Sequence, residues 1–261
     1  MGTKNYLILS DIHANAEALR AVFTASLGTF RPDVFVVAGD IVGYGADPRL
    51  VIDHLRGLGL ALVAVDGNHD RAARDKEGPV RMNPEAATAL RRTRDRISSA
   101  EAAFLLGLPG TAATGPFTVV HDPAVGPERH AYVRTPHQAR AVLADAHTRH
   151  AIVGHTHLPG FFEATVGGDG TTITRVADFV PFTGGEVLRL KADARYVLNP
   201  GSVGQPRDGD PRASYLEITE AEDGSITVRA CRVGYDVAAA QAKMRTRGFP
   251  EFGAARLAVG R

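Results

Sequence analysis

Short apolar runs recur along the first part of the chain, and each is continuous rather than alternating. They cover residues 6–9, 34–37, 60–65, 117–120 and 151–153. Short runs rich in β-branched residues are typical of strands that are buried on both faces. Amphipathic stretches lie between them and predict helices over residues 16–27, after Pro48, and once or twice within residues 84–107, with Asn15 and Asp47 as candidate N-caps of the first two. Alternating strands and helices predict a layered α/β domain.

The second half of the chain has a different pattern. Strand-like segments cover residues 171–176, 187–190, 196–198, 214–219 and 226–232, and glycine-rich turns separate several of them. This pattern predicts a second sheet with antiparallel pairing, packed on the first. Residues 237–245 are predicted to form a helix. No repeat or linker divides the chain, so we expect a single domain over residues 1–261.

Composition narrows the class of protein. The chain has 261 residues, of which 44% are hydrophobic and 23% charged, as in ordinary globular proteins. Its 30 basic and 29 acidic side chains leave a net charge of +1, which disfavours nucleic acid as a partner. The single cysteine, Cys231, excludes an intramolecular disulfide and suits a reducing compartment. With no signal-peptide pattern and no apolar run near the ~20 residues of a membrane span, we expect a soluble cytoplasmic protein.

Residues that bind metals follow five of the apolar runs. They are Asp11-Ile12-His13, Gly39-Asp40, Gly67-Asn68-His69-Asp70, His121 and Gly154-His155-Thr156-His157. Because the carboxyl ends of strands in an open α/β sheet share one edge, these side chains are predicted to converge. In extended chain, residues two apart project to the same side, so Asp11 and His13 would aim at one point. His155 and His157 would do the same, or reach two adjacent ions. Glycines 39, 67 and 154 would allow sharp turns.

The donor atoms indicate which ions would bind. Imidazole, carboxylate and amide oxygen without a nearby thiolate suit manganese, iron, zinc or nickel. More than six candidate ligands are too many for one tetrahedral ion and fit two ions bridged by a carboxylate. Alone, an Asp-x-His motif also occurs as a cap and a Gly-Asp pair as a turn. The metal interpretation therefore depends on all five motifs occurring in this order.

Taken together, the motifs resemble those of the calcineurin-like metallophosphoesterase superfamily, over residues 11–157. Gly43-Tyr44-Gly45 and the segment Asn199-Pro200-Gly201-Ser202-Val203-Gly204-Gln205-Pro206-Arg207 are similar to the small bacterial branch of diadenosine-tetraphosphatase-like proteins and stand-alone phosphodiesterases. The resemblance implies an α/β fold, a four-layer αββα sandwich of two mixed β-sheets flanked by helices. It also implies hydrolysis of a small phosphate ester, either a diester or a monoester and including nucleotides.

The resemblance further assigns roles to residues. One ion would take Asp11, His13, Asp40 and His157, and the other would take Asp40, Asn68, His121 and His155, so that Asp40 bridges. Two divalent transition-metal ions would hold a bridging hydroxide that attacks phosphorus, while His69, without binding metal, protonates the leaving group. Asn68, Arg207 and Tyr44 are candidate substrate-binding residues. The alternatives are an exposed loop position for Arg207 and simple packing for Tyr44.

This chain departs from the better-known members in two places. Phosphoprotein phosphatases carry Asp and Arg where Gly43 and Tyr44 stand, so protein-phosphatase activity is not expected and the partner of His69 is open. Asp70 is adjacent to it, although neighbouring side chains often point apart. His121 is followed by Asp122-Pro123, where related bacterial proteins often have Gly-Ser.

Several other functions remain open at this point. A non-catalytic interaction scaffold on the same fold and a nuclease of the superfamily are the main alternatives. A cysteine or serine hydrolase would need Cys231 or Ser202 as nucleophile, and neither has a visible acid–base partner. Arg91, Arg92, Arg94 and Arg96 form either a solvated helix face or a phosphate-attracting rim. The native metal and the oligomeric state are also open.

Overall fold

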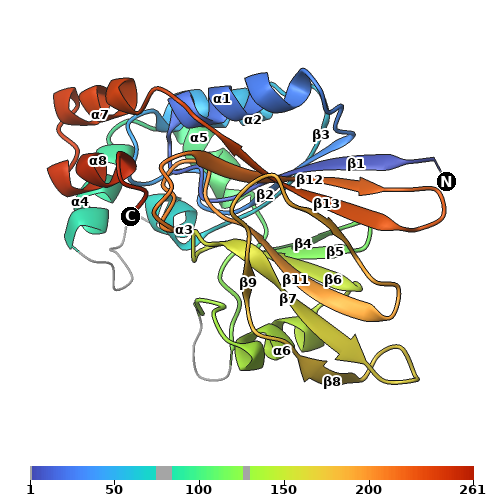
Figure 1. Cartoon of the computed structure of the whole chain (residues 1–261). Coiled ribbons are helices and arrows are strands. Elements are labelled where there is room, and N and C mark those ends of the chain that lie inside the picture. The colour runs from blue at the N-terminus through green and yellow to red at the C-terminus, as the bar shows by residue number, and fades with distance from the viewer. Residues whose placement is uncertain (1, 75–83, 126–129) are drawn as a thin grey trace.

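Two β-sheets face each other in the computed structural model, and helices cover their outer faces (Figure 1). The structure describes residues 2–74, 84–125 and 130–261. The first sheet has the strand order β10-β13-β12-β1-β2-β3. In that order its strands are Val187–Arg189, Ile226–Val233, Ala213–Glu220, Lys4–Leu9, Val34–Ala38 and Ala61–Val65.

The second sheet has the order β4-β5-β6-β11-β7-β8, with β9 paired to β7. Its strands are β4 Thr111–Thr114, β5 Phe117–Val120, β6 His150–Val153, β11 Ala194–Pro200, β7 Pro159–Val166, β8 Ile173–Val176 and β9 Val180–Pro181. Both sheets mix parallel and antiparallel pairs: β1, β2 and β3 run parallel, as do β5, β6 and β11, whereas β12 runs antiparallel to β1.

The helices fall into three groups. The first sheet is covered by α1 (Ala16–Leu27), α2 (Pro48–Arg56), α3 (Asn68–Arg74) and α5 (Ser99–Leu106), and the second by α6 (Pro136–Asp145). At one end of the sandwich, α4 (Pro84–Arg94) packs with α7 (Val237–Thr246) and α8 (Glu251–Leu257) (Figure 1). None of the described helices is long and apolar enough to cross a bilayer.

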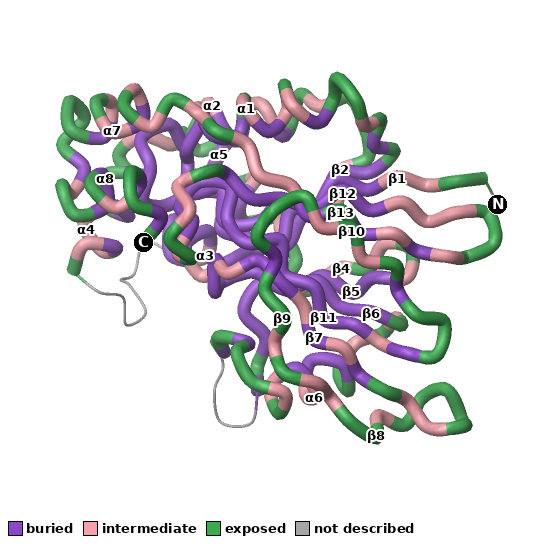
Figure 2. The backbone as a smooth tube through the Cα atoms, in the orientation of Figure 1, coloured by how far each residue is buried: buried purple, intermediate pink, exposed green. Residues whose placement is uncertain are grey.

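Alternation along the central strands separates the core into layers. Leu7 and Leu9 of β1 face the helices, whereas Tyr6 and Ile8 of the same strand face the second sheet. A third apolar cluster joins α6 to the other face of the second sheet. The central strands of both sheets are therefore buried, as the continuous apolar runs predicted (Figure 2). These layers confirm the predicted αββα sandwich of two mixed sheets.

The predicted strands and helices lie where expected, with additions and one correction. The pattern missed β4, β7 and β9 and the helices α3, α6 and α8. The correction concerns the five strands that precede the metal-binding motifs, which were expected in one sheet. They divide between two: β1, β2 and β3 belong to the first, and β5 and β6 to the second. A run that is buried on both faces has the same pattern in either sheet, so sequence pattern alone does not assign it.

Candidate metal centre

The loops after β1, β2, β3, β5 and β6 meet at one end of the sandwich. Asp40, which follows β2 in the first sheet, has its Oδ2 atom 3.3 Å from Nε2 of His121, which follows β5 in the second. Asp11, after β1, lies 3.0 Å from Nε2 of His157, after β6. The polar cluster therefore spans the seam between the sheets, where carboxyl ends from both are available.

The backbone around these residues is left-handed rather than extended. Positive φ values occur at Asp11 (51°), His13 (48°), Asp40 (52°), His155 (69°) and His157 (59°). Such angles are uncommon outside glycine and cluster at functional sites. The expected reason for convergence, extended chain with residues i and i+2 on one side, was wrong. Tight left-handed turns directly after the strands aim these side chains at a common point.

Hydrogen bonds hold the turns in this strained form. The N–H groups of Asp11 and His13 donate to the carbonyls of Gly39 and Asp40 over 3.0 and 2.9 Å. The Ser202 hydroxyl, which is fully buried, donates to the Asp11 carbonyl over 2.8 Å. The Asn199 amide donates to the Gly154 carbonyl over 3.1 Å. The segment 199–207 therefore braces the turns, and Ser202 is unavailable as a nucleophile.

Two of the three predicted turn glycines serve a different purpose. Gly39 has a φ of +83° and does turn the chain. Gly67 and Gly154 have no positive φ; they are sites of close approach instead. A Cβ at Gly67 would lie 2.1 Å from Oδ1 of Asp40, and one at Gly154 would lie 2.3 Å from Oγ of Ser10. Small size, more than conformational freedom, explains glycine at these two positions.

Gly67→Ala is expected to displace the Asp40 carboxylate, because the added methyl group would overlap it. Overpacking of this kind costs about 1–3 kcal/mol of stability, and we expect metal content to fall as well. Gly168→Ala is the matched control, since nothing lies within 4 Å of its Cβ position and its φ is not positive. Thermal unfolding and metal analysis of the two variants check this; equal behaviour would contradict it.

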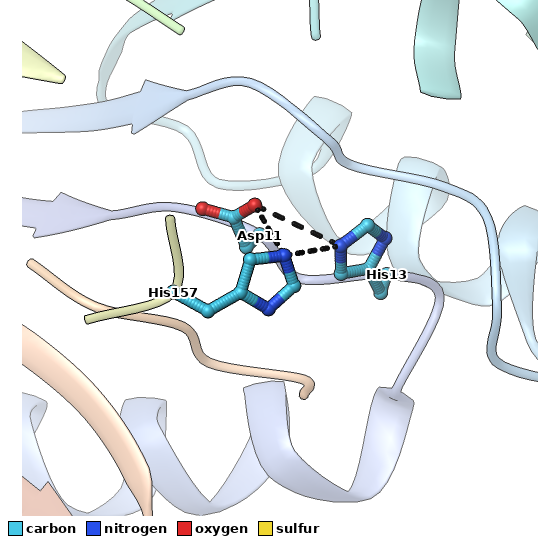
Figure 3. A group of neighbouring side chains, drawn as sticks. All are labelled: Asp11, His13 and His157. Atoms are coloured by element: carbon cyan, nitrogen blue, oxygen red, sulfur yellow. Dashed lines mark hydrogen bonds and ion pairs between the residues drawn. The ribbon is translucent and has the colours of Figure 1, made fainter. Parts of the chain in front are cut away.

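One group of candidate ligands consists of Asp11, His13 and His157 (Figure 3). The Nε2 atoms of the two histidines are 3.2 Å apart, and Asp11 Oδ1 lies 3.7 Å from that of His13. All three side chains are at most 2% exposed. The three residues point toward one another from two different strand ends.

Asp40 belongs to the two other groups. It lies with His13 and His69 in one and with His121 and His155 in the other, and the donor atoms of each group are within 4.8 Å of one another. Its Oδ2 atom is 3.6 Å from His13 Nε2, and its Oδ1 atom accepts the His69 backbone N–H over 2.9 Å. Asp40 thus stands between the clusters, as a bridging carboxylate must.

The orientation of the rings suits cations. Nδ1 of His13, His121 and His157 lies 3.1, 2.7 and 2.5 Å from the carbonyls of Val42, Ala38 and Gln205 respectively. A ring that donates through Nδ1 presents a lone pair at Nε2, as metal-binding histidines do. The Oδ1 atom of Asn68 is buried and has no hydrogen-bond partner in the part of the chain that the structure describes. Since unpaired buried oxygens are costly, this atom also fits a cation. The individual ligand assignments stay predictions.

The pKa values follow from this burial and crowding. Burial lowers the pKa of His69 to about 4 and that of His155 to about 3, and it lowers those of His13 and His157 as well. Burial acts in the same sense on His121, but Asp40 and Asp11 outweigh it and raise the pKa of that histidine to about 10. At neutral pH without metal, His121 therefore carries a proton while the other four histidines are neutral.

Metal binding at neutral pH is expected to release about one proton, because His121 must be neutral to bind a cation. With its pKa raised to about 10, affinity for metal should increase with pH up to that value. Calorimetric titration with Mn²⁺ in two buffers of different ionisation enthalpy measures the number released. If no proton is released at neutral pH, the ion does not displace the proton of His121 and the prediction is wrong.

His69 has no carboxylate partner among the described residues. Its Nδ1 atom is buried without a hydrogen bond and would lie 2.4 Å from a Cβ at Gly43. A side chain at this position would therefore require the His69 ring to move. The neighbouring Asp70 carboxylate points elsewhere and accepts the N–H groups of Ile41, Val42 and Gly67 over 3.0–3.1 Å. Asp70 therefore ties the β2 and β3 loops together and does not orient His69.

Tyr44 and Arg207 border the cluster. The Tyr44 ring centroid is 4.7 Å from that of His13 and 4.6 Å from that of His69, so it packs on the site and also lines its mouth. The guanidinium carbon of Arg207 lies 5.8 Å from the Tyr44 ring centroid. Arg207 is half-buried rather than loosely exposed, and its only hydrogen bond in the described part of the chain is to Gln205, at 3.4 Å.

Several residues beside the cluster were not predicted. Tyr132 stacks on His155 with ring centroids 3.9 Å apart, and Arg134 lies over the Tyr132 ring. Asp122, the unusual residue after His121, forms an ion pair with Arg71, and its Oδ2 atom lies 2.8 Å from Nδ1 of His130. Their positions depend on tertiary contacts, and no motif in the sequence marks them.

The arginines after residue 90 and Cys231 were considered for other functional roles. Arg92, Arg94 and Arg96 donate to the carbonyls of Gly248, Ala72 and Arg247 and so join this part of the chain to neighbouring segments. Arg91 and Arg92 are exposed, as expected for a solvated helix face, and the phosphate-attracting rim stays a prediction. Burial raises the pKa of the Cys231 thiol to about 12, which makes it a poor nucleophile.

Comparison with known proteins is consistent with this geometry. Residues 5–223 match the family model described as the calcineurin-like phosphoesterase superfamily domain. An uncharacterised protein of Methanocaldococcus jannaschii is 30% identical over 97% of both chains. A metallophosphoesterase from Sphaerobacter thermophilus has a similar crystal structure, with a TM-score of 0.78, 35% identity and full coverage of both chains. A hypothetical protein from Pyrococcus horikoshii shares the fold, with a TM-score of 0.75 at 17% identity over 98% of both chains. The chain therefore belongs to the calcineurin-like phosphoesterase superfamily.

Proposed function

We propose that this protein hydrolyses a small phosphate ester with two divalent transition-metal ions, manganese, iron, zinc or nickel. The observation that carries the proposal is the convergence of two buried groups, Asp11–His13–His157 and Asp40–His121–His155, which Asp40 links through its contact with His13. Beside them lies Arg207, which has no carboxylate partner among the described residues. A non-catalytic scaffold protein with this fold does not need a complete set of metal ligands. Nor does it need a strained backbone at five of those ligand residues.

The contacts of Asp40 with His13 and His121, and of Asp11 with His157, support the division of ligands that the resemblance implies. Asp11, His13, Asp40 and His157 would hold one ion, and Asp40, Asn68, His121 and His155 the other. Ions bound there would neutralise phosphate charge and activate a water molecule for attack on phosphorus. His13, His155 and His157, whose pKa values are lowered by burial, need no deprotonation before they bind, whereas His121 must first lose a proton. The carbonyl contacts at Nδ1 hold the rings of His13, His121 and His157 in a binding orientation.

His69 and Arg207 would act on the ester itself. His69 contacts the cluster but is not needed to complete either ligand set, and the positive charge of Arg207 reaches it strongly enough to lower its pKa further. A phosphate dianion between them would pair with the Arg207 guanidinium. His69 would then donate a hydrogen bond or a proton to the leaving oxygen. Tyr44 and Asn68 would shape the pocket around the same phosphate.

A panel assay tests this proposal. Metal-stripped protein is reloaded with Mn²⁺, Fe²⁺, Zn²⁺, Ni²⁺ or Mg²⁺ and assayed with aryl phosphomonoesters, aryl phosphodiesters, cyclic nucleotides and dinucleoside polyphosphates. We expect turnover of at least one ester that depends on added transition metal. Tight binding of two ions without hydrolysis of any ester would favour the scaffold instead, and cleavage of DNA or RNA in preference to small esters would favour a nuclease.

A further inference from the structure

A second arginine lies at the mouth of the site, on the last helix of the chain. Arg256 belongs to α8, whose Ala254 and Leu257 are buried in the same apolar cluster as Tyr44 and Met244. This packing fixes α8 against the loop that follows β2. Arg256, Tyr44 and Met244 line one hollow, and Tyr44 and Met244 continue into a second hollow lined by His13. Tyr44, which packs on His13 and His69, therefore connects the hollow of Arg256 to the metal cluster.

Arg256 and Arg207 both lie next to Tyr44. The Arg207 guanidinium is over the Tyr44 ring, and Arg256 borders the same residue from α8. Burial and then the positive charge of Arg207 lower the pKa of Arg256, which places the two guanidinium groups within electrostatic reach of each other. The aliphatic and aromatic surroundings of Arg256 include Phe252, whose ring centroid is 5.1 Å from the guanidinium carbon.

Neither guanidinium has a counter-charge in residues 2–74, 84–125 and 130–261. Arg207 contacts only the Gln205 amide oxygen, its Nε atom is buried without a partner, and Arg256 forms no ion pair. Glu85 lines the hollow with Arg256, but no ion pair joins them. Neighbouring arginines differ: Arg245 pairs with Glu251, and Arg247 pairs with Asp47.

Two adjacent positive charges that are partly buried and unpaired disfavour each other, and a bound anion relieves this repulsion. A guanidinium fork matches the oxygens of a phosphate in a bidentate manner, so two forks offer more donors than one phosphate held by metal ions requires. The two arginines can therefore bind a second anionic group in addition to the phosphate at the metal cluster.

We propose that Arg256, together with Arg207, binds a second phosphoryl group of the substrate, next to the phosphate held at the metal cluster. The protein would thereby select esters with two neighbouring anionic groups over simple esters. This inference rests on the proposed function, because it takes the metal cluster as the place of the first phosphate. Arg256 would position the substrate and set specificity, and it would take no part in bond cleavage.

Binding of two inorganic probes to the Mn²⁺-loaded protein tests the inference. Orthophosphate has one phosphoryl group, and imidodiphosphate has two joined by a bridge that resists hydrolysis. Calorimetry at constant free Mn²⁺ should show imidodiphosphate binding more tightly to the natural protein. Arg256→Gln should weaken imidodiphosphate by about tenfold or more and orthophosphate by less than about threefold. Arg56→Gln, which removes an exposed arginine at the end of α2, should change neither.

Each other outcome contradicts the inference. If Arg256→Gln binds imidodiphosphate as tightly as the natural protein, Arg256 does not contact the second phosphoryl group. If the affinities for both probes fall equally, Arg256 contributes only a general positive potential. Arg256→Lys keeps the charge without the fork; it should fold if the glutamine variant does not, and should still weaken imidodiphosphate selectively. If no ester in the panel is hydrolysed, the proposed function fails, yet the two affinities still decide the role of Arg256.

Discussion

The Asp40→Asn variant is expected to lose most of its bound metal and at least about 10³-fold in turnover, since even outer-shell partners of a metal contribute about 10–100-fold. Asp40 lies within 3.6 Å of His13 and 3.3 Å of His121, which belong to different ligand groups. An amide in its place keeps the shape but removes the negative charge between the two proposed ions. Both sites should therefore weaken at once. Metal content by plasma emission and turnover of an aryl phosphodiester measure the effect.

Asp66→Asn is the matched control for that substitution. Asp66 is also buried and lies close in sequence to the cluster, but it pairs with Arg71 and Arg74 and belongs to no ligand group. Its loss should lower thermal stability and leave the metal content unchanged. Two ions per chain and full turnover in Asp40→Asn would show that the bridging assignment is wrong.

The His69→Ala variant is expected to keep its metal and lose about 10²–10⁴-fold in rate on esters with poor leaving groups. Its effect on an activated aryl ester should be much smaller, because such a leaving group departs without protonation. Burial holds the pKa of His69 at about 4, so the ring is neutral at neutral pH until phosphate charge arrives beside it. The measurement is the dependence of rate on leaving-group pKa for the natural protein and the variant.

His69→Gln separates two ways in which His69 can act. Glutamine donates a hydrogen bond but no proton, so it should restore activity only if hydrogen bonding is sufficient. Because His69 also lies in one candidate ligand group with His13 and Asp40, metal content must be measured in both variants. Loss of an ion from His69→Ala would make this residue a ligand and would contradict its assignment as the proton donor.

The C-terminal helices contribute to the site although they lie outside the residues that match the family model. That match ends at residue 223, whereas α7 begins at Val237. Lys243 of α7 forms ion pairs with Glu17 and Asp47, and Arg247 pairs with Asp47, so the helices are tied to the loops beside the cluster. If Arg256 binds substrate as proposed, α8 would set substrate preference without changing the metal ligands.

The sequence by itself determined most of the strands, five of the eight described helices and the candidate ligands. Continuous apolar runs mark buried strands because both faces exclude water, and polar residues with ligand chemistry directly after such runs mark strand ends. The missed strand β7 has a pattern interrupted by polar residues, consistent with its half-exposed positions. Helix α8 is only seven residues long and has little periodicity to detect.

Only the tertiary structure decided how the site is assembled. Which sheet a buried strand joins depends on pairing partners far away in the chain, so the division of β1–β3 and β5–β6 between two sheets left no local trace. The left-handed turns at Asp11 and His157 are held by contacts with distant segments, including the brace at Ser202. The same holds for Arg256, since a surface arginine and a substrate-binding arginine differ only in what packing places beside them.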